Sequence, residues 1–143
     1  MIDRNTIAAK LAELDKRVRR VEATRRDSGD AYASDETAAE IVAFNLMLAV
    51  QSCSDLVSHL IADEGWPAAA SQAAGFNRLR DQGVISAGTA AALCRAVGLR
   101  NVVAHGYGGI NPAMVFAAAT RGTADLEVFA REVAGWVEQR ASR

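Results

Sequence analysis

Apolar residues recur every three or four positions along most of this chain, and no segment shows the strict alternation of a half-buried strand. The clearest example is the series Ile7, Leu11, Leu14, Val18 and Val21 near the start. This spacing places the five side chains on one side of a helix. Alanine, leucine, arginine and glutamate, which favour helix, are frequent, and there are only two prolines. The pattern therefore predicts an all-α fold.

Turn-forming residues divide the chain into five expected helices. The expected segments are about 4–27, 35–63, 70–82, 86–105 and 111 to the C-terminal region. The length of 143 residues suits one core. We therefore expect a single domain over residues 1–143, built as an antiparallel helical bundle.

Several residues predict where these helices begin and end. Ser34 is the expected N-cap of the second helix, after a turn at residues 27–34. Asn111 and Pro112 are the expected N-cap and first residue of the fifth helix. Gly122 is expected to kink or interrupt that helix.

The second expected helix is apolar over more than one face. Leu46, Val50, Cys53 and Val57 form one stripe, whereas Phe44 and other apolar residues lie off it. Such a helix is buried on more than one side. In so small a domain, one of those sides could be a subunit interface.

Charge and cysteine usage indicate a soluble protein of the reducing cytoplasm. The net charge is -1 and the pI about 6.1, so any contact with RNA would be local. Cys53 and Cys94 lie far apart and form no CxxC pair, and two histidines give no zinc site. The charged N-terminal segment does not resemble a signal peptide, and we expect no apolar run near the roughly 20 residues of a membrane helix.

The segment "RNVVAHGY", residues 100–107, carries the most suggestive chemistry. Histidine transfers protons near neutral pH, and the arginine guanidinium matches the geometry of a phosphate. Together they suit cleavage of an RNA phosphodiester without a metal. However, five residues of helix turn through about 500°, so Arg100 and His105 should point about 140° apart. Two copies across a symmetric interface could bring both groups to one phosphate.

Spacing alone leaves a structural interpretation open. An Arg-x4-His pair on a helix is common by chance. His105 could cap the C-terminus of its helix, where a cation suits the dipole, and Arg100 could be a surface residue.

The longer segment "RNVVAHGYGGINP" resembles the R-x4-H-x-Y signature of HepT-like ribonuclease toxins of the HEPN superfamily. "FNRLRDQGVIS", upstream, resembles that family's short helix and turn before the helix that bears the motif. An apolar second helix that contains Gln51 and an aliphatic fifth helix also follow in the same order as in that family. The resemblance therefore extends over most of residues 35–137.

The resemblance implies a metal-independent RNase that needs no cofactor and acts as a homodimer, with paired motifs at the interface. Arg100 would bind and stabilise the phosphate, His105 would be the general acid or base, and Asn101 would orient the site. Tyr107 corresponds to the tyrosine that an MntA-type nucleotidyltransferase antitoxin modifies with AMP. A bulky anionic adduct there would block RNA.

One departure and one alternative accompany this resemblance. Family members often carry an acidic residue where this chain has Asn111, so a contribution of negative charge at this position to antitoxin binding is not expected here. The superfamily also includes non-catalytic helical modules that bind nucleotidyltransferases or nucleotides, and this chain could be one of them.

Other polar residues have two interpretations. Half of the 16 basic residues lie in the first 26 positions. Most suit a solvated helix face, with Arg19, Arg20 and Arg26 as candidates for RNA contact. Ser52, Ser54 and Asp55 could line the cleft or form hydrogen bonds across a dimer.

Overall fold

The structure, a computed structural model, describes residues 1–105 and 111–141, with side chains described for residues 1–101 and 111–140. In chain order the elements are α1 (Arg4–Thr24), α2 (Gly29–Ala33), α3 (Glu36–Glu64), α4 (Gln72–Asp81), α5 (Ala87–His105), α6 (Pro112–Ala117), the π-helix η1 (Ala118–Gly122) and α7 (Thr123–Ala141). No strand occurs among the described residues, so the prediction of an all-α fold is confirmed.

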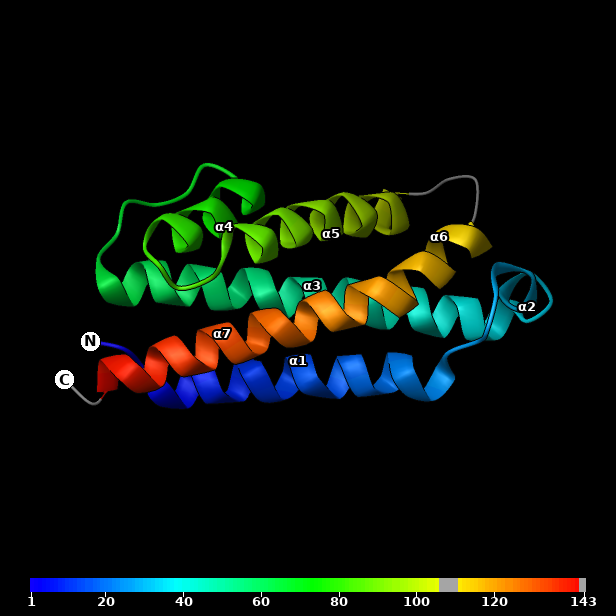
Figure 1. Cartoon of the computed structure of the whole chain (residues 1–143), viewed down its shortest axis with the longest axis horizontal. Helices are drawn as coiled ribbons and strands as arrows, with labels where there is room; N and C mark the ends of the chain where they lie inside the picture. The colour runs from blue at the N-terminus through cyan, green and yellow to red at the C-terminus, as the bar shows by residue number, and fades with distance from the viewer. Residues whose placement is uncertain (106–110, 142–143) are drawn as a thin grey trace.

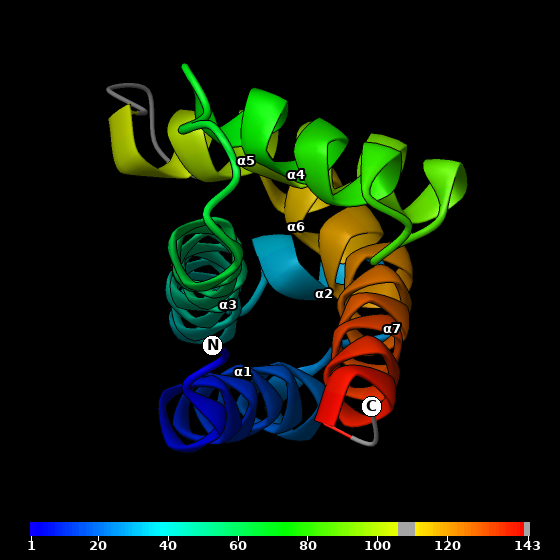
Figure 2. The same cartoon turned by 90° about the vertical axis from the view of Figure 1, so that its left-hand side faces the viewer.

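Four long helices, α1, α3, α5 and α7, surround a common core. α1 and α3 lie side by side and antiparallel (Figure 1), and α7 packs against α1 and α5. The end-on view in Figure 2 places α5, together with α4, on the opposite side of the bundle from α1. The antiparallel bundle predicted from the sequence is therefore observed.

The expected turn at residues 27–34 contains a short helix that the sequence analysis did not predict. The Ser28 hydroxyl accepts a hydrogen bond from the Ala31 N–H at 3.1 Å and so caps α2. Tyr32 anchors this helix because its ring is buried and its hydroxyl accepts a bond from the Arg26 N–H. The prediction of Ser34 as N-cap of the long second helix is wrong. Ser34 ends α2, and the Asp35 carboxylate caps α3 instead.

The predictions at the start and middle of the last helical segment are confirmed. The Asn111 side chain accepts hydrogen bonds from the N–H groups of Ala113 and Met114, and Pro112 is the first residue of α6. The expected interruption near Gly122 is the π-helical turn η1, in which Gly122 is the last residue. Such turns are often found at functional sites.

Aromatic pairs join distant parts of the core. Phe76 of α4 meets Phe129 of α7 in a T-shaped contact, with 5.9 Å between ring centroids. Trp66, just after α3, packs on Trp136 of α7 at 5.8 Å, and the Arg140 guanidinium lies over the Trp136 ring. Both tryptophans therefore pack against other parts of the domain.

One described helix, α3, is long and apolar enough to span a membrane by length and composition. The expectation that no such segment exists was therefore too strict. An 18-residue window has a mean hydropathy of 1.5, and 56% of it is buried within the domain. A core helix of a soluble protein meets the same criterion, so the packing already accounts for the composition of α3.

Candidate active site

Arg100 lies near the end of α5 and faces α3. Its Nη2 donates a hydrogen bond to Oε1 of Gln51 at 3.1 Å, and its Nη1 donates to Oδ1 of the neighbouring Asn101 at 3.2 Å. Arg100 is half-buried, whereas Asn101 is exposed. The guanidinium is thus held between two neutral acceptors, and neither of them cancels its positive charge.

The amide of Gln51 is itself held by a carboxylate one helical turn further along α3. Gln51 Nε2 donates to Asp55 Oδ1 at 3.2 Å, and Asp55 Oδ2 accepts from Lys10 Nζ of α1 at 3.2 Å. We call this series of side chains, which links α1, α3 and α5, the polar chain: Lys10, Asp55, Gln51, Arg100 and Asn101. Because the Gln51 NH₂ group binds Asp55, its carbonyl oxygen faces Arg100.

Two buried polar atoms in this region have no hydrogen-bond partner among the described residues: Nε of Arg100 and Oγ of Ser54. Buried donors in proteins are nearly always paired, so an unpaired one is a candidate for contact with a ligand. A guanidinium binds phosphate through charge-assisted hydrogen bonds. Within the described part of the chain, the Arg100 side chain therefore combines a positive charge that no carboxylate pairs with and a donor without a partner.

The remaining motif residues lie at or beyond the edge of the described structure. His105 is the last residue of α5, and its side chain lies outside the described residues. Tyr107 also lies outside them. The expected 140° separation between Arg100 and His105 thus stays a prediction.

The basic residues of α1 have different surroundings. Arg19 pairs with Asp15 on the helix surface, at 2.8 Å. Arg19 and Arg20 line a shallow groove between α1 and α3. Arg26 binds the Asp35 carboxylate at 2.9 Å and two backbone carbonyls, so it joins the end of α1 to the start of α3. RNA contact by these arginines stays a prediction.

The sequence leaves two roles open for the polar residues of α3: lining a cleft or forming hydrogen bonds across a dimer. Asp55 belongs to the polar chain, Ser54 has a buried unpaired hydroxyl, and Ser52 is buried. Lys10 was not singled out, since its 45-residue separation from Asp55 gives no local signal. The i,i+4 spacing of Gln51 and Asp55 was a signal in the sequence that could have linked these two residues.

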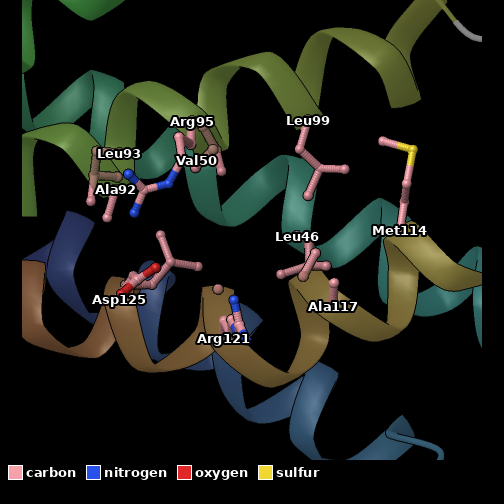
Figure 3. A pocket seen from close by; sticks show the side chains of 14 residues that line it. Leu46, Val50, Ala92, Leu93, Arg95, Leu99, Met114, Ala117, Arg121 and Asp125 are labelled. Carbon is pink, nitrogen blue, oxygen red and sulfur yellow. The ribbon is translucent and has the colours of Figure 1, made fainter. Parts of the chain in front are cut away.

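A separate apolar cavity of about 300 Å³ lies between α3, α5 and the segment from α6 to α7 (Figure 3). Leu46, Leu93 and Leu99 line it, with Arg95 and Asp125 on opposite walls. Arg100, the predicted catalytic residue whose side chain the structure describes, does not line this cavity.

Other catalytic chemistries find little support in the part of the chain that the structure describes. No group of three or more histidine, cysteine, aspartate or glutamate side chains there could hold a metal ion. Cys53 is fully buried, and burial raises the pKa of its thiol. A thiol in that state is a poor nucleophile.

Comparison with known proteins identifies a family whose model matches this chain. A family model described as ribonuclease HepT-like matches residues 14–133. Comparison with curated proteins finds no match.

Solved structures share the fold. A HEPN toxin of Shewanella oneidensis, tri-AMPylated and in complex with an MNT antitoxin, superimposes with a TM-score of 0.84 at 24% identity, over 94% of this chain and 99% of that one. A toxin–antitoxin structure with AMP-PNP gives 0.84 at 23% identity, over 92% and 98%. YutE of Bacillus subtilis, a cytosolic protein of unknown function, gives 0.83 at 13% identity, over 97% and 93%.

Proposed function

Because the chain belongs to the HepT-like ribonuclease family, we propose that it is a metal-independent RNA endonuclease and the toxin of a toxin–antitoxin pair. The observation that carries the proposal is the placement of Arg100. Gln51 holds its guanidinium, while Nε has no hydrogen-bond partner among the residues that the structure describes. The protein would act in the cytoplasm as a single domain over residues 1–143, without a cofactor.

Arg100 would bind the scissile phosphate and stabilise the negative charge that grows on it during the reaction. His105 would take the proton of the 2′-hydroxyl, whose oxygen then attacks the phosphorus. The bond to the 5′-oxygen breaks, and that oxygen needs a proton as it leaves. The partner's His105 is suited to supply it, and Asn101 would keep the guanidinium in orientation.

This chemistry needs two copies of the chain, and α3 offers a surface on which they could meet. Phe44 is 53% exposed, an unusual exposure for a phenylalanine. Phe44, Leu48, Gln51 and Asp55 follow one another at steps of four, three and four, so they share one face of α3. An apolar contact at Phe44 would therefore lie on the same face as the residue that holds Arg100.

We also propose an MntA-type nucleotidyltransferase antitoxin as partner and Tyr107 as the site at which it attaches AMP. Similar toxins form complexes with MNT antitoxins, and one is AMPylated. Each AMP group adds negative charge next to the phosphate-binding arginine. It would repel RNA and occupy its place. Asn111 is the position at which antitoxin recognition would differ from that of relatives with an acidic residue there.

The test is cleavage of RNA by the purified chain, together with growth arrest when the chain is expressed alone. We expect Arg100→Ala and His105→Ala to lose at least about 100-fold in cleavage rate and to lose toxicity. Arg95→Ala is the matched control because Arg95 is an exposed arginine on the same helix that borders the other cavity. Equal cleavage and equal toxicity of all the variants and the parent would refute the proposal.

A different outcome would favour the non-catalytic alternative. In that case the parent chain would be folded and dimeric, would bind the nucleotidyltransferase, and would leave RNA intact in the presence of a chelator and in its absence.

A further inference from the structure

A second cavity, of about 460 Å³, lies between α3, the segment after it and α4. This volume falls in the roughly 300–1,000 Å³ range of small-ligand pockets. Its walls combine aliphatic side chains with polar ones, and the polar members are Gln51, Ser54, Asp55, Ser58, Ser71 and Gln72. Among the described residues that line the apolar cavity beside α6, by contrast, the polar ones are all charged: Arg95, Arg121 and Asp125.

This cavity adjoins the candidate phosphate site. Gln51 and Asp55 line it and are also members of the polar chain. Gln51 in turn accepts the hydrogen bond from Arg100. A phosphate at Arg100 and a group in this cavity would therefore both lie next to Gln51.

Ser54 supplies the observation that points to a ligand. Its hydroxyl is buried on the wall of this cavity and has no hydrogen-bond partner among the described residues. A serine within a helix often satisfies its hydroxyl on the carbonyl four residues earlier, but Ser54 does not. A buried, unpaired hydroxyl destabilises the fold, and a ligand with a polar edge would supply its partner.

Trp66 adds an aromatic surface. It lines the same cavity and is only partly buried by its contact with Trp136. Proteins read single-stranded RNA by stacking unpaired bases on aromatic rings and by hydrogen bonds to the base edges. The cavity offers both kinds of contact, and Gln51 on its wall connects it to the arginine expected to bind the phosphate.

We propose that this cavity binds the nucleobase next to the phosphate held by Arg100, so that the substrate is single-stranded RNA with one base turned into the pocket. Ser54 and Gln72 would form hydrogen bonds to the base edge, and Trp66 would contact its face. The proposal rests on the proposed ribonuclease function and adds to it a determinant of base preference.

The experiment measures binding of dinucleotides to the purified full chain by titration calorimetry. The probes are ApA, CpC, GpG and UpU, each lacking the first 2′-hydroxyl so that the proposed chemistry cannot cleave them. The variant is Ser54→Ala, which removes one oxygen atom. Ser52→Ala is the matched control because Ser52 is buried on the same helix and does not line the cavity.

We expect one or two of the four dinucleotides to bind best, and Ser54→Ala to weaken that binding about 3- to 10-fold, as the loss of one hydrogen bond does. Its melting temperature should be equal to or above that of the parent, since no protein contact is lost. Ser52→Ala should bind as the parent does. A free nucleoside should bind more weakly than the dinucleotide. Arg100→Ala should lower the affinity for the dinucleotide and leave the affinity for the nucleoside unchanged, because only the dinucleotide carries a phosphate.

Equal affinities of Ser54→Ala and the parent, or no dinucleotide binding at all, would overturn the base pocket. The ribonuclease proposal is judged separately on intact RNA. Cleavage by the parent, with no effect of Ser54→Ala on affinity or base preference, would refute only the pocket. Base-selective binding that depends on Ser54, with no cleavage, would refute only the nuclease.

Discussion

Gln51 and Arg100, 49 residues apart in the chain, meet through a hydrogen bond of 3.1 Å between α3 and α5. The other end of the Gln51 amide is fixed by Asp55, which Lys10 holds from α1. A side-chain amide has only two ends, so occupying its NH₂ group commits its carbonyl to the guanidinium. Three helices of the bundle therefore determine where the arginine charge lies.

The first prediction concerns this positioning. Gln51→Leu should lower the rate of RNA cleavage about 10- to 100-fold, because a displaced guanidinium meets the phosphate in the wrong geometry. Most of the loss should fall on kcat, and the melting temperature should change little. Gln82→Leu, an exposed glutamine after α4, is the control. Unchanged kcat in Gln51→Leu would show that the hydrogen bond does not matter for catalysis.

The second prediction concerns the exposed face of α3. Phe44→Arg should weaken self-association at least about 10-fold, since a charge would replace an aromatic anchor. Analytical ultracentrifugation over a range of concentrations measures the effect, and cleavage should fall with the dimer fraction. Val128→Arg is the control because Val128 is an exposed apolar residue on α7. If both variants associated like the parent, Phe44 would lie outside the interface.

The third prediction concerns the start of α3. Asp35→Ala should lower the melting temperature at neutral pH, because it removes both the N-cap of α3 and the partner of Arg26. Asp35→Asn should retain most of the cap and lose only the ion pair. The hydrogen bond from the Ala38 N–H, and then that from Arg26, lowers the pKa of Asp35.

The lowered pKa fixes the direction of the pH effect. A group whose pKa is lower in the folded than in the unfolded state stabilises the protein at pH values above its pKa in the unfolded state. This stabilisation is lost as the pH falls through its pKa in the folded state. The difference between the parent and Asp35→Asn should therefore shrink in acid. Thermal melts from pH 7 down to pH 3 measure it, and a constant difference would contradict the assignment.

The fourth prediction concerns two acidic residues that meet between α1 and α7. A hydrogen bond with Glu127, followed by burial, raises the pKa of Glu22. The ionised form of Glu22 is disfavoured beside Glu127, so Glu127→Gln should stabilise the fold at neutral pH by roughly a few tenths of a kcal/mol, as expected for exposed charges. The gain should vanish as the pH falls through the raised pKa of Glu22, where the parent pair takes up a proton. Denaturant melts at pH 7 and pH 4 test this, and an equal gain at both would refute it.

The sequence predicted most of the fold because the deciding information is local. Helical spacing of apolar residues, the Asn111–Pro112 start and Gly122 each act within a few residues. α2 was missed because its stability comes from the buried ring of Tyr32, a tertiary contact. Ser34 and Asp35 are both residues that favour the N-cap position. The observed N-cap of α3 is Asp35, which also forms an ion pair with Arg26.

The candidate site was only partly predictable for the same reason. Arg100 and Asn101 stand in a recognisable motif, and Gln51 agreed with the family in order. Their hydrogen bonds depend on how α3 and α5 pack. The contact of Lys10 with Asp55 joins residues 45 positions apart. Helical periodicity indicates only contacts within a few residues, so the polar chain could not be predicted from the sequence and is observed only in the folded structure.

The last prediction concerns the close approach of α4 to α3 beside the base pocket. A Cβ atom added to Gly75 would lie 2.8 Å from Cγ1 of Val57, too close for any real contact. Val57 is buried and β-branched within a helix, so its methyl group has little freedom to move. Gly75→Ala should therefore cost roughly 1–3 kcal/mol in the free energy of unfolding, partly offset by the higher helix propensity of alanine.

A double-mutant cycle isolates this contact. Val57→Ala should remove the clash, so the combined variant should be more stable than the sum of the two single losses by about 1 kcal/mol or more. Gly98→Ala is the control because a Cβ atom there meets open space in the middle of α5, and it should stabilise the fold by up to about 1 kcal/mol. Urea denaturation gives all five free energies. Strict additivity of Gly75→Ala and Val57→Ala would mean that α4 does not depend on this glycine to pack against α3.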